Sequence, residues 1–146
     1  MKYFATQPDV IEVLNDLLDL ELNSVFQFLG ESAPYLNHGN AALRRPLAQM
    51  VVASHRRTRE LSNTIDDLGG TPIPRGLQLE DQYLAYLSLK FLLPRLINAK
   101  ELAIARWEAA RNLVGTRSPE AAELLDRHLA EYRADIAILR KAADLR

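Results

Sequence analysis

The sequence predicts an all-α fold, in which one domain covering residues 1–146 forms an antiparallel four-helix bundle. Four long segments carry apolar residues at helical spacing, and none shows the sustained alternation that is typical of a strand. The connections between these segments are short, long and short in turn, which favours two antiparallel hairpins. A chain of 146 residues can bury one core, so we expect a single domain.

The first helix is expected over about residues 7–36, beginning near Thr6 and Pro8 and kinked or frayed by Pro34. Its inward stripe consists of Val10, Leu14, Leu17, Glu21, Val25 and Phe28. A second apolar face contains Ile11, Leu18, Leu22, Phe26 and Leu29. A helix that is apolar on two sides offers more surface than one core needs, so we expect a homodimer through this helix.

The second helix begins between residues 41 and 46 and ends at Leu68. Gly69 and Gly70 can adopt the left-handed conformation that caps a helix, and Pro72 cannot continue one. The third helix is expected over residues 82–114, with a kink at Pro94.

The fourth helix has the clearest beginning. Ser118 is the expected N-cap, Pro119 takes the first helical position, and Glu120 lies in the first turn, where the helix dipole favours an acid. The helix then runs to the end of the chain. Residues 71–81 form a connection long enough to travel most of the length of a bundle. The sequence therefore predicts one long crossover between the second and third helices.

Composition excludes several classes of function. A formal net charge of -1 provides no basic surface for nucleic acid and no attraction to an anionic membrane. The absence of cysteine excludes disulfides, thiolate metal sites and a cysteine nucleophile. The sequence shows no secretory signal and no apolar run of the roughly 20 residues that span a bilayer, so we expect a cytoplasmic protein.

Polar residues occupy positions that should face the core, where a charge needs a partner or a metal. Glu21 lies between Leu17 and Val25 in the inward stripe of the first helix. The second helix allows two apolar stripes: one passes through both Ser54 and Arg57, and the other keeps Ser54 inside but turns Arg57 to the flank. Ser54 therefore faces inward in either case, whereas Arg57 does so in only one.

The third and fourth helices add further polar groups. Glu101 falls in phase with Ile97 and Ile104. Each of these groups alone suits a packed or solvent-facing residue, but together they place a polar side chain near the middle of all four helices. One face of the fourth helix carries Leu125, His128, Tyr132, Asp135 and Leu139, with Glu131 beside it.

These features resemble the ferritin-like superfamily, and its bacterioferritin and rubrerythrin-type bundles in particular. The stretch DLELNSVFQF, which contains Glu21, is similar to the first metal helix of that family, and DDLGGTP is similar to the end of its second helix. The family builds a carboxylate-bridged metal pair from one Glu on each of two helices and a Glu-x-x-His pair on each of the other two. The resemblance implies a ferritin-like bundle with the long crossover described above.

The resemblance also assigns the metal positions, and this chain departs from them. Glu21 and Glu101 match the two single glutamates. Ser54 and Arg57 stand where the first Glu-x-x-His pair would be. In the stretch HLAEYRADIAIL, Tyr132 and Asp135 stand at the second pair, so neither expected histidine is present.

The retained carboxylates would repel one another in a low dielectric unless a cation lies among them. The Arg57 guanidinium is always charged and can bridge two carboxylates. We therefore expect it to replace the iron, giving a ferritin-like protein without ferroxidase chemistry or a cofactor, which acts as a structural, interaction or ligand-binding protein. The expected buried network consists of Glu21, Ser54, Arg57, Glu101, Tyr132 and Asp135.

Two other hypotheses stay open. In one, the protein still binds iron, manganese or zinc at a rearranged site and supports an oxidase or iron-handling activity. Its ligands would be Glu21, Glu101, Asp135 or Glu131, and His128 or His55. In the other, the chain is a generic four-helix bundle whose charged side chains all extend to solvent.

Overall fold

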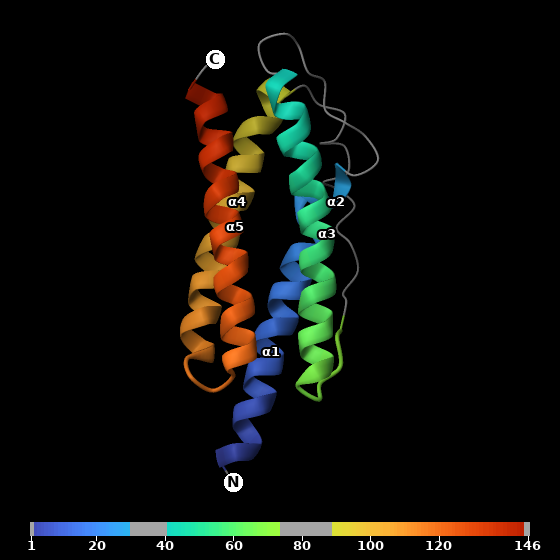
Figure 1. Cartoon of the computed structure of the whole chain (residues 1–146), viewed down its shortest axis with the longest axis vertical. Helices are drawn as coiled ribbons and strands as arrows, with labels where there is room; N and C mark the ends of the chain where they lie inside the picture. The colour runs from blue at the N-terminus through green and yellow to red at the C-terminus, as the bar shows by residue number, and fades with distance from the viewer. Residues whose placement is uncertain (1, 30–40, 74–88, 145–146) are drawn as a thin grey trace.

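The computed structural model describes residues 2–29, 41–73 and 89–144, and this part of the chain contains helices and no strand. The all-α prediction is confirmed. The helices are α1 (Lys2–Leu22), α2 (Val25–Phe28), the short 3-10 helix η1 (Ala41–Leu43), α3 (Arg44–Asp67), α4 (Leu89–Val114) and α5 (Pro119–Asp144). The long helices lie side by side, with α1 and α5 running in one direction and α3 and α4 in the other (Figure 1).

Each long helix packs against two others. Helix α1 contacts α3 and α4, and α5 contacts the same two helices from the other side. Helices α1 and α5 therefore face each other across the centre of the helix group, as do α3 and α4. The predicted long crossover and the connection between the first two helices fall largely on residues 74–88 and 30–40, which lie outside the described residues.

The first predicted helix is wrong in its bounds. Helix α1 already begins at Lys2 and ends at Leu22, and a separate short helix follows. Ser24 causes this interruption by acting as an N-cap, because its Oγ accepts a hydrogen bond from the Phe26 backbone N–H at 3.3 Å. Asn23 adds to it by donating from its side chain to the Asp19 backbone oxygen at 2.9 Å. Short polar side chains compete in this way with the regular helical hydrogen bonds.

The predicted end of the second helix and the predicted beginning of the fourth helix are confirmed. Gly69 has φ +87°, and the Gly70 N–H donates to the Ile65 backbone oxygen at 2.9 Å, which together close α3 in a Schellman motif. At the beginning of α5, the Ser118 Oγ accepts from the Ala121 N–H at 3.2 Å. The end of α3 and the beginning of α5 are therefore set by local sequence, as expected.

The second apolar face of the first helix is not left for a partner. Leu18, Phe26 and Leu29 on that face are buried within this chain. Ile11 packs so closely on the end of α3 that a Cβ at Gly70 would lie 2.7 Å from it. This face therefore gives no support to the predicted dimer. No helix in the described part of the chain is long and apolar enough to cross a membrane.

The first prediction concerns the cap of α3. Replacing Gly69 by Ala should lower the free energy of unfolding by about 1 kcal/mol, because a side chain at φ +87° is strained even though the space around it is open. Replacing Gly69 by Asn, which tolerates the left-handed conformation better, should have a smaller effect. Urea unfolding of the three proteins measures the difference, and equal losses for Ala and Asn would contradict this explanation.

Candidate functional site: a buried polar layer

The core is divided into two apolar clusters by a layer of polar side chains. One cluster contains Leu14, Leu61, Trp107 and Leu125, and the other contains Phe26, Met50, Leu93 and Leu139. Along α3, α4 and α5 the polar layer lies between the residues of these clusters, and Glu21 lies between the cluster residues of α1 and those of α2. The polar layer consists of Glu21 from α1, Ser54 and Arg57 from α3, Lys100 from α4, and Glu131, Tyr132 and Asp135 from α5.

The Glu21 carboxylate lies at the centre of the polar layer and accepts three side-chain hydrogen bonds. The Ser54 Oγ donates to its Oε2 at 2.5 Å, and the Arg57 Nε donates to its Oε1 at 2.9 Å. The Tyr132 hydroxyl donates to Oε1 as well. Donors from both α3 and α5 thus converge on a carboxylate from α1. The side chain of Glu21 is 3% exposed, so these donors replace the water that it loses on folding.

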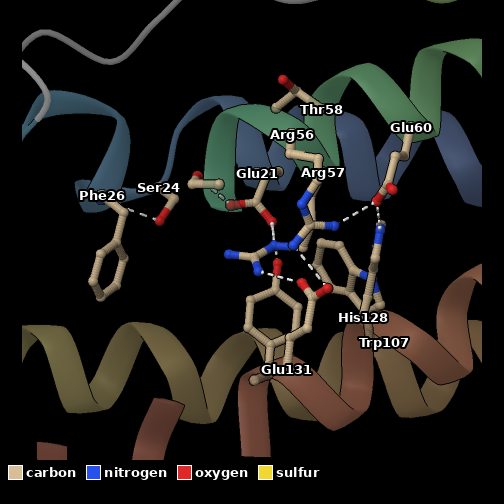
Figure 2. Close-up of polar contacts among 12 residues, drawn as sticks. Glu21, Ser24, Phe26, Arg56, Arg57, Thr58, Glu60, Trp107, His128 and Glu131 are labelled. Carbon is tan, nitrogen blue, oxygen red and sulfur yellow. Dashed lines mark hydrogen bonds and ion pairs between the residues drawn. The ribbon is translucent and has the colours of Figure 1, made fainter. Parts of the chain in front are cut away.

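Arg57 is the cation of this site and is fully buried. Its Nη1 lies 2.9 Å from Glu131 Oε1, so the guanidinium joins one carboxylate on α1 to another on α5 (Figure 2). Its central carbon lies 4.3 Å from the centre of the Tyr132 ring, an arrangement that adds a cation–π attraction. Burial disfavours the charged form, but the charge of Glu21, together with Tyr132 and the hydrogen bonds to Glu21 and Glu131, outweighs it and raises the Arg57 pKa.

Lys100 is a second buried cation that the sequence analysis missed. Its Nζ lies 3.0 Å from Asp135 Oδ2 and 4.1 Å from the centre of the Phe26 ring. Burial lowers the pKa of Lys100, and the negative charge of Asp135 offsets part of that effect. The hydrophobic spacing on α4 contained the signal, because Leu93, Leu96, Lys100, Ala103 and Trp107 form one buried stripe.

Tyr132 and His128 link the polar layer to the adjacent turn of the bundle. Burial and the charge of Glu21 raise the Tyr132 pKa well above its ordinary value, so the hydroxyl stays protonated and remains a donor. Trp107 Nε1–H donates to His128 Nδ1 at 3.1 Å. The neutral His128 therefore carries its proton on Nε2, which lies 2.9 Å from Glu60 Oε1 (Figure 2). Burial lowers the His128 pKa, which favours this neutral form.

The structure brings most of the predicted network together. Glu21, Ser54, Arg57 and Tyr132 are in direct contact, and the α3 stripe that contains both Ser54 and Arg57 is the buried one. Asp135 reaches the layer through its ion pair with Lys100.

The predicted place of Glu101 in the network is wrong. Its side chain is 49% exposed and pairs with Arg140 at 3.0 Å. The buried stripe of α4 passes through Lys100, and the adjacent residue on a helix points about 100° away from it. The Glu101 carboxylate therefore lies on the surface of α4, outside the polar layer.

His128 and Glu131 have partners other than the predicted metal. His128 is hydrogen-bonded to Trp107 and Glu60. Glu131 accepts hydrogen bonds from both Arg57 and Arg56, and its Oε2 lies 2.7 Å from Arg56 Nη2. Burial raises the Glu131 pKa, but the hydrogen bonds and positive charges of Arg56 and Arg57 outweigh this effect and lower the pKa. His55 is exposed on the outside of α3.

The polar layer does not fit the metal site that the ferritin-like resemblance implies. Within the described residues, no group of three or more His, Asp or Glu side chains is arranged to hold a metal ion. The donors on Glu21 occupy both of its oxygens, and Arg57 and Lys100 would repel a divalent cation. Comparisons of the chain with protein-family models, with curated proteins and with solved structures find no match.

The second prediction concerns the Glu21–Arg57 ion pair. Replacing Arg57 by Ala should lower the free energy of unfolding by about 3–5 kcal/mol, because it leaves the buried Glu21 charge without a cation. Replacing it by Lys should recover only part of this loss, since one ammonium cannot reproduce the forked contacts to Glu21 and Glu131. Replacement of the exposed Arg59, on the same helix, by Ala is the control and should alter stability by no more than about 0.5 kcal/mol. Chemical denaturation measures all three, and equal effects of the two Ala substitutions would contradict the role of Arg57.

The third prediction concerns pH. The His128 pKa is lowered in the folded protein, so below about pH 6.5 the unfolded chain binds a proton that the folded protein does not bind. The free energy of unfolding should therefore decrease as the pH falls from about 7 to about 5.5, above the range in which Glu60 and Glu131 titrate. Replacing His128 by Gln should make this decrease shallower, and replacing the exposed His55 by Gln should not. Denaturation midpoints across this range supply the measurement, and identical slopes for wild type and His128→Gln would show that His128 is not the group responsible.

Proposed function

We propose that this protein is a ferritin-like helical bundle in which fixed side-chain cations stand in place of metals, and that it acts as a structural, interaction or ligand-binding protein without ferroxidase chemistry. One observation supports this most strongly. The Arg57 guanidinium, fully buried, donates at 2.9 Å to the glutamate that matches the first metal helix. Ser54, the other residue at the replaced Glu-x-x-His pair, donates to the same carboxylate.

The charges of the polar layer support the proposal. Two buried cations, Arg57 and Lys100, face the carboxylates of Glu21, Glu131 and Asp135, and Arg56 adds a third positive charge on Glu131. Positive and negative charges are thus matched by side chains alone. A divalent ion brought into this layer would have to displace at least one of these cations, together with its hydrogen bonds.

The chemistry of these cations favours a non-catalytic role. An arginine stays charged at every physiological pH and cannot accept or release an electron. Tyr132 and Ser54 act as donors to Glu21 and leave its oxygens little capacity for a substrate. The polar layer can therefore fix the relative heights of α1, α3 and α5, and the surface of the bundle is left for recognition.

The fourth prediction tests this proposal directly. Protein purified without a chelator should contain close to no iron, manganese or zinc by elemental analysis. Ferrous iron added in air should produce no oxo-bridged absorption in the near ultraviolet. About one or two metals per chain, as in the di-iron carboxylate proteins, would overturn the proposal.

Engineered variants sharpen the test. The substitutions Ser54→Glu, Arg57→His and Lys100→Glu together rebuild a Glu-x-x-His pair beside Glu21 and remove both buried cations. If the scaffold is ferritin-like, this triple variant should bind iron. Arg57→Gln, which removes a cation but adds no carboxylate or imidazole ligand, is the matched control and should bind none. Failure of a correctly folded triple variant to take up metal would argue against a ferritin-like ancestry of these positions.

A further inference from the structure

A groove runs along the outside of the molecule between α1 and α4. It consists of two adjoining hollows of about 290 and 470 Å³, which share Leu20 in their walls. The outer edge of the first hollow is lined by Leu20 beside Leu102, and its inner end reaches the polar layer. The second hollow is lined by Asp16 and Leu20 beside Arg106. The register between α1 and α4 follows from the polar layer, where Glu21 and Lys100 lie close enough for their charges to interact. Because the two helices run in opposite directions, Asp16, five residues before Glu21, and Arg106, six residues after Lys100, lie at about the same height.

The two walls of the groove show the spacing of helices that pack against further helices. Val13, Asp16 and Leu20 on α1 follow each other at intervals of three and four residues, the spacing of a coiled-coil seam. The wall formed by α4 continues this pattern with Leu102, Arg106, Ala109 and Leu113. Leu102 is 46% exposed and Leu113 is 58% exposed, so the α4 wall presents apolar side chains to solvent.

Each wall also carries an exposed charge, of opposite sign. Asp16 on α1 and Arg106 on α4 line the same hollow, yet no ion pair joins either of them to another described residue. The two side chains lie on opposite walls at one height. A partner that presented a cation opposite Asp16 and an anion opposite Arg106 would match this groove in both shape and charge.

We propose that the partner is a second copy of this chain, bound groove to groove about a two-fold axis parallel to the helices. Such a rotation exchanges the two sides of the groove and leaves every height unchanged. Helix α1 of one copy then lies against α4 of the other, and Asp16 faces Arg106 of the partner subunit. At the other levels Leu20 faces Leu102 of the partner subunit, and Val13 faces Ala109 of the partner subunit.

The charge pattern selects this axis over the other two-fold arrangement. An axis perpendicular to the helices at the level of Asp16 would set α1 against α1 and α4 against α4. Asp16 would then meet its own copy, as would Arg106, and like charges directly opposite each other oppose association. The axis parallel to the helices forms two equivalent opposite-charge pairs. This interface uses a different face of α1 from the second apolar face, which is already buried, and it does not rest on the proposed function of the polar layer.

The fifth prediction is that the full chain forms a dimer through this groove. Sedimentation velocity over about a hundredfold range of protein concentration measures the dimer constant. Wild type should form a dimer. Asp16→Arg and Arg106→Asp should each weaken the dimer at least about tenfold, because each one sets two pairs of like charges across the interface. A one-to-one mixture of the two variants should recover the dimer, since every cross-pair in the mixed dimer joins opposite charges.

Controls separate this interface from general effects of charge. Arg45→Asp reverses an exposed charge on α3 and should leave the dimer constant unchanged. Circular dichroism checks that every variant is helical, and the double variant Asp16→Arg with Arg106→Asp should dimerise like wild type. A wild-type monomer at every concentration would overturn the proposal. So would single variants that dimerise as strongly as wild type, or a mixture that stays monomeric.

Discussion

The ion pair between Glu21 and Arg57 is the constraint on which the arrangement of this protein depends. Neither side chain has access to water, so each charge requires the other, and the separation of 2.9 Å leaves little freedom in how α1 meets α3. The second contact of Arg57, to Glu131, extends the same requirement to α5. A slide of any one helix by a single turn, about 5.4 Å, would leave a buried charge unpaired.

The remaining polar groups complete this arrangement and allow apolar packing on both sides. The Tyr132 hydroxyl donates to Glu21, and the centroid of its ring lies 5.0 Å from that of Trp107. This single side chain therefore belongs to both the polar layer and the apolar core. Lys100 pairs with Asp135 and lies over the Phe26 ring, so it connects the polar layer to the second apolar cluster. Phe26 belongs to α2, so the short helix that follows the interruption of α1 also covers the polar layer.

The all-α fold and most of the polar layer could be predicted from the sequence. Helix ends such as Gly69 and Ser118 depend on local backbone conformation, which short sequence signals describe well. Ser54 and Glu21 were found because a polar residue in an apolar stripe is conspicuous. The interruption at Ser24 was not predicted, because Val25 and Phe26 continue the apolar pattern on both faces. Lys100 was missed because its neighbour Glu101 matched the expected ligand type, although the apolar spacing favoured Lys100.

A fixed cation and a metal ion have different consequences for such a bundle. A bound metal stabilises the folded state only while the ion is present at a sufficient concentration, and its ligands must keep an open position if it is to react. Arg57 belongs to the chain, so its charge is always present, and the hydrogen bonds from Arg57, Ser54 and Tyr132 engage both Glu21 oxygens. Under the proposed function, the interior of this protein holds its helices in register and the outer faces are left for recognition. The α1–α4 groove, with unpaired Asp16 and Arg106 across from each other among the described residues, is the face that we propose for a second copy of the chain.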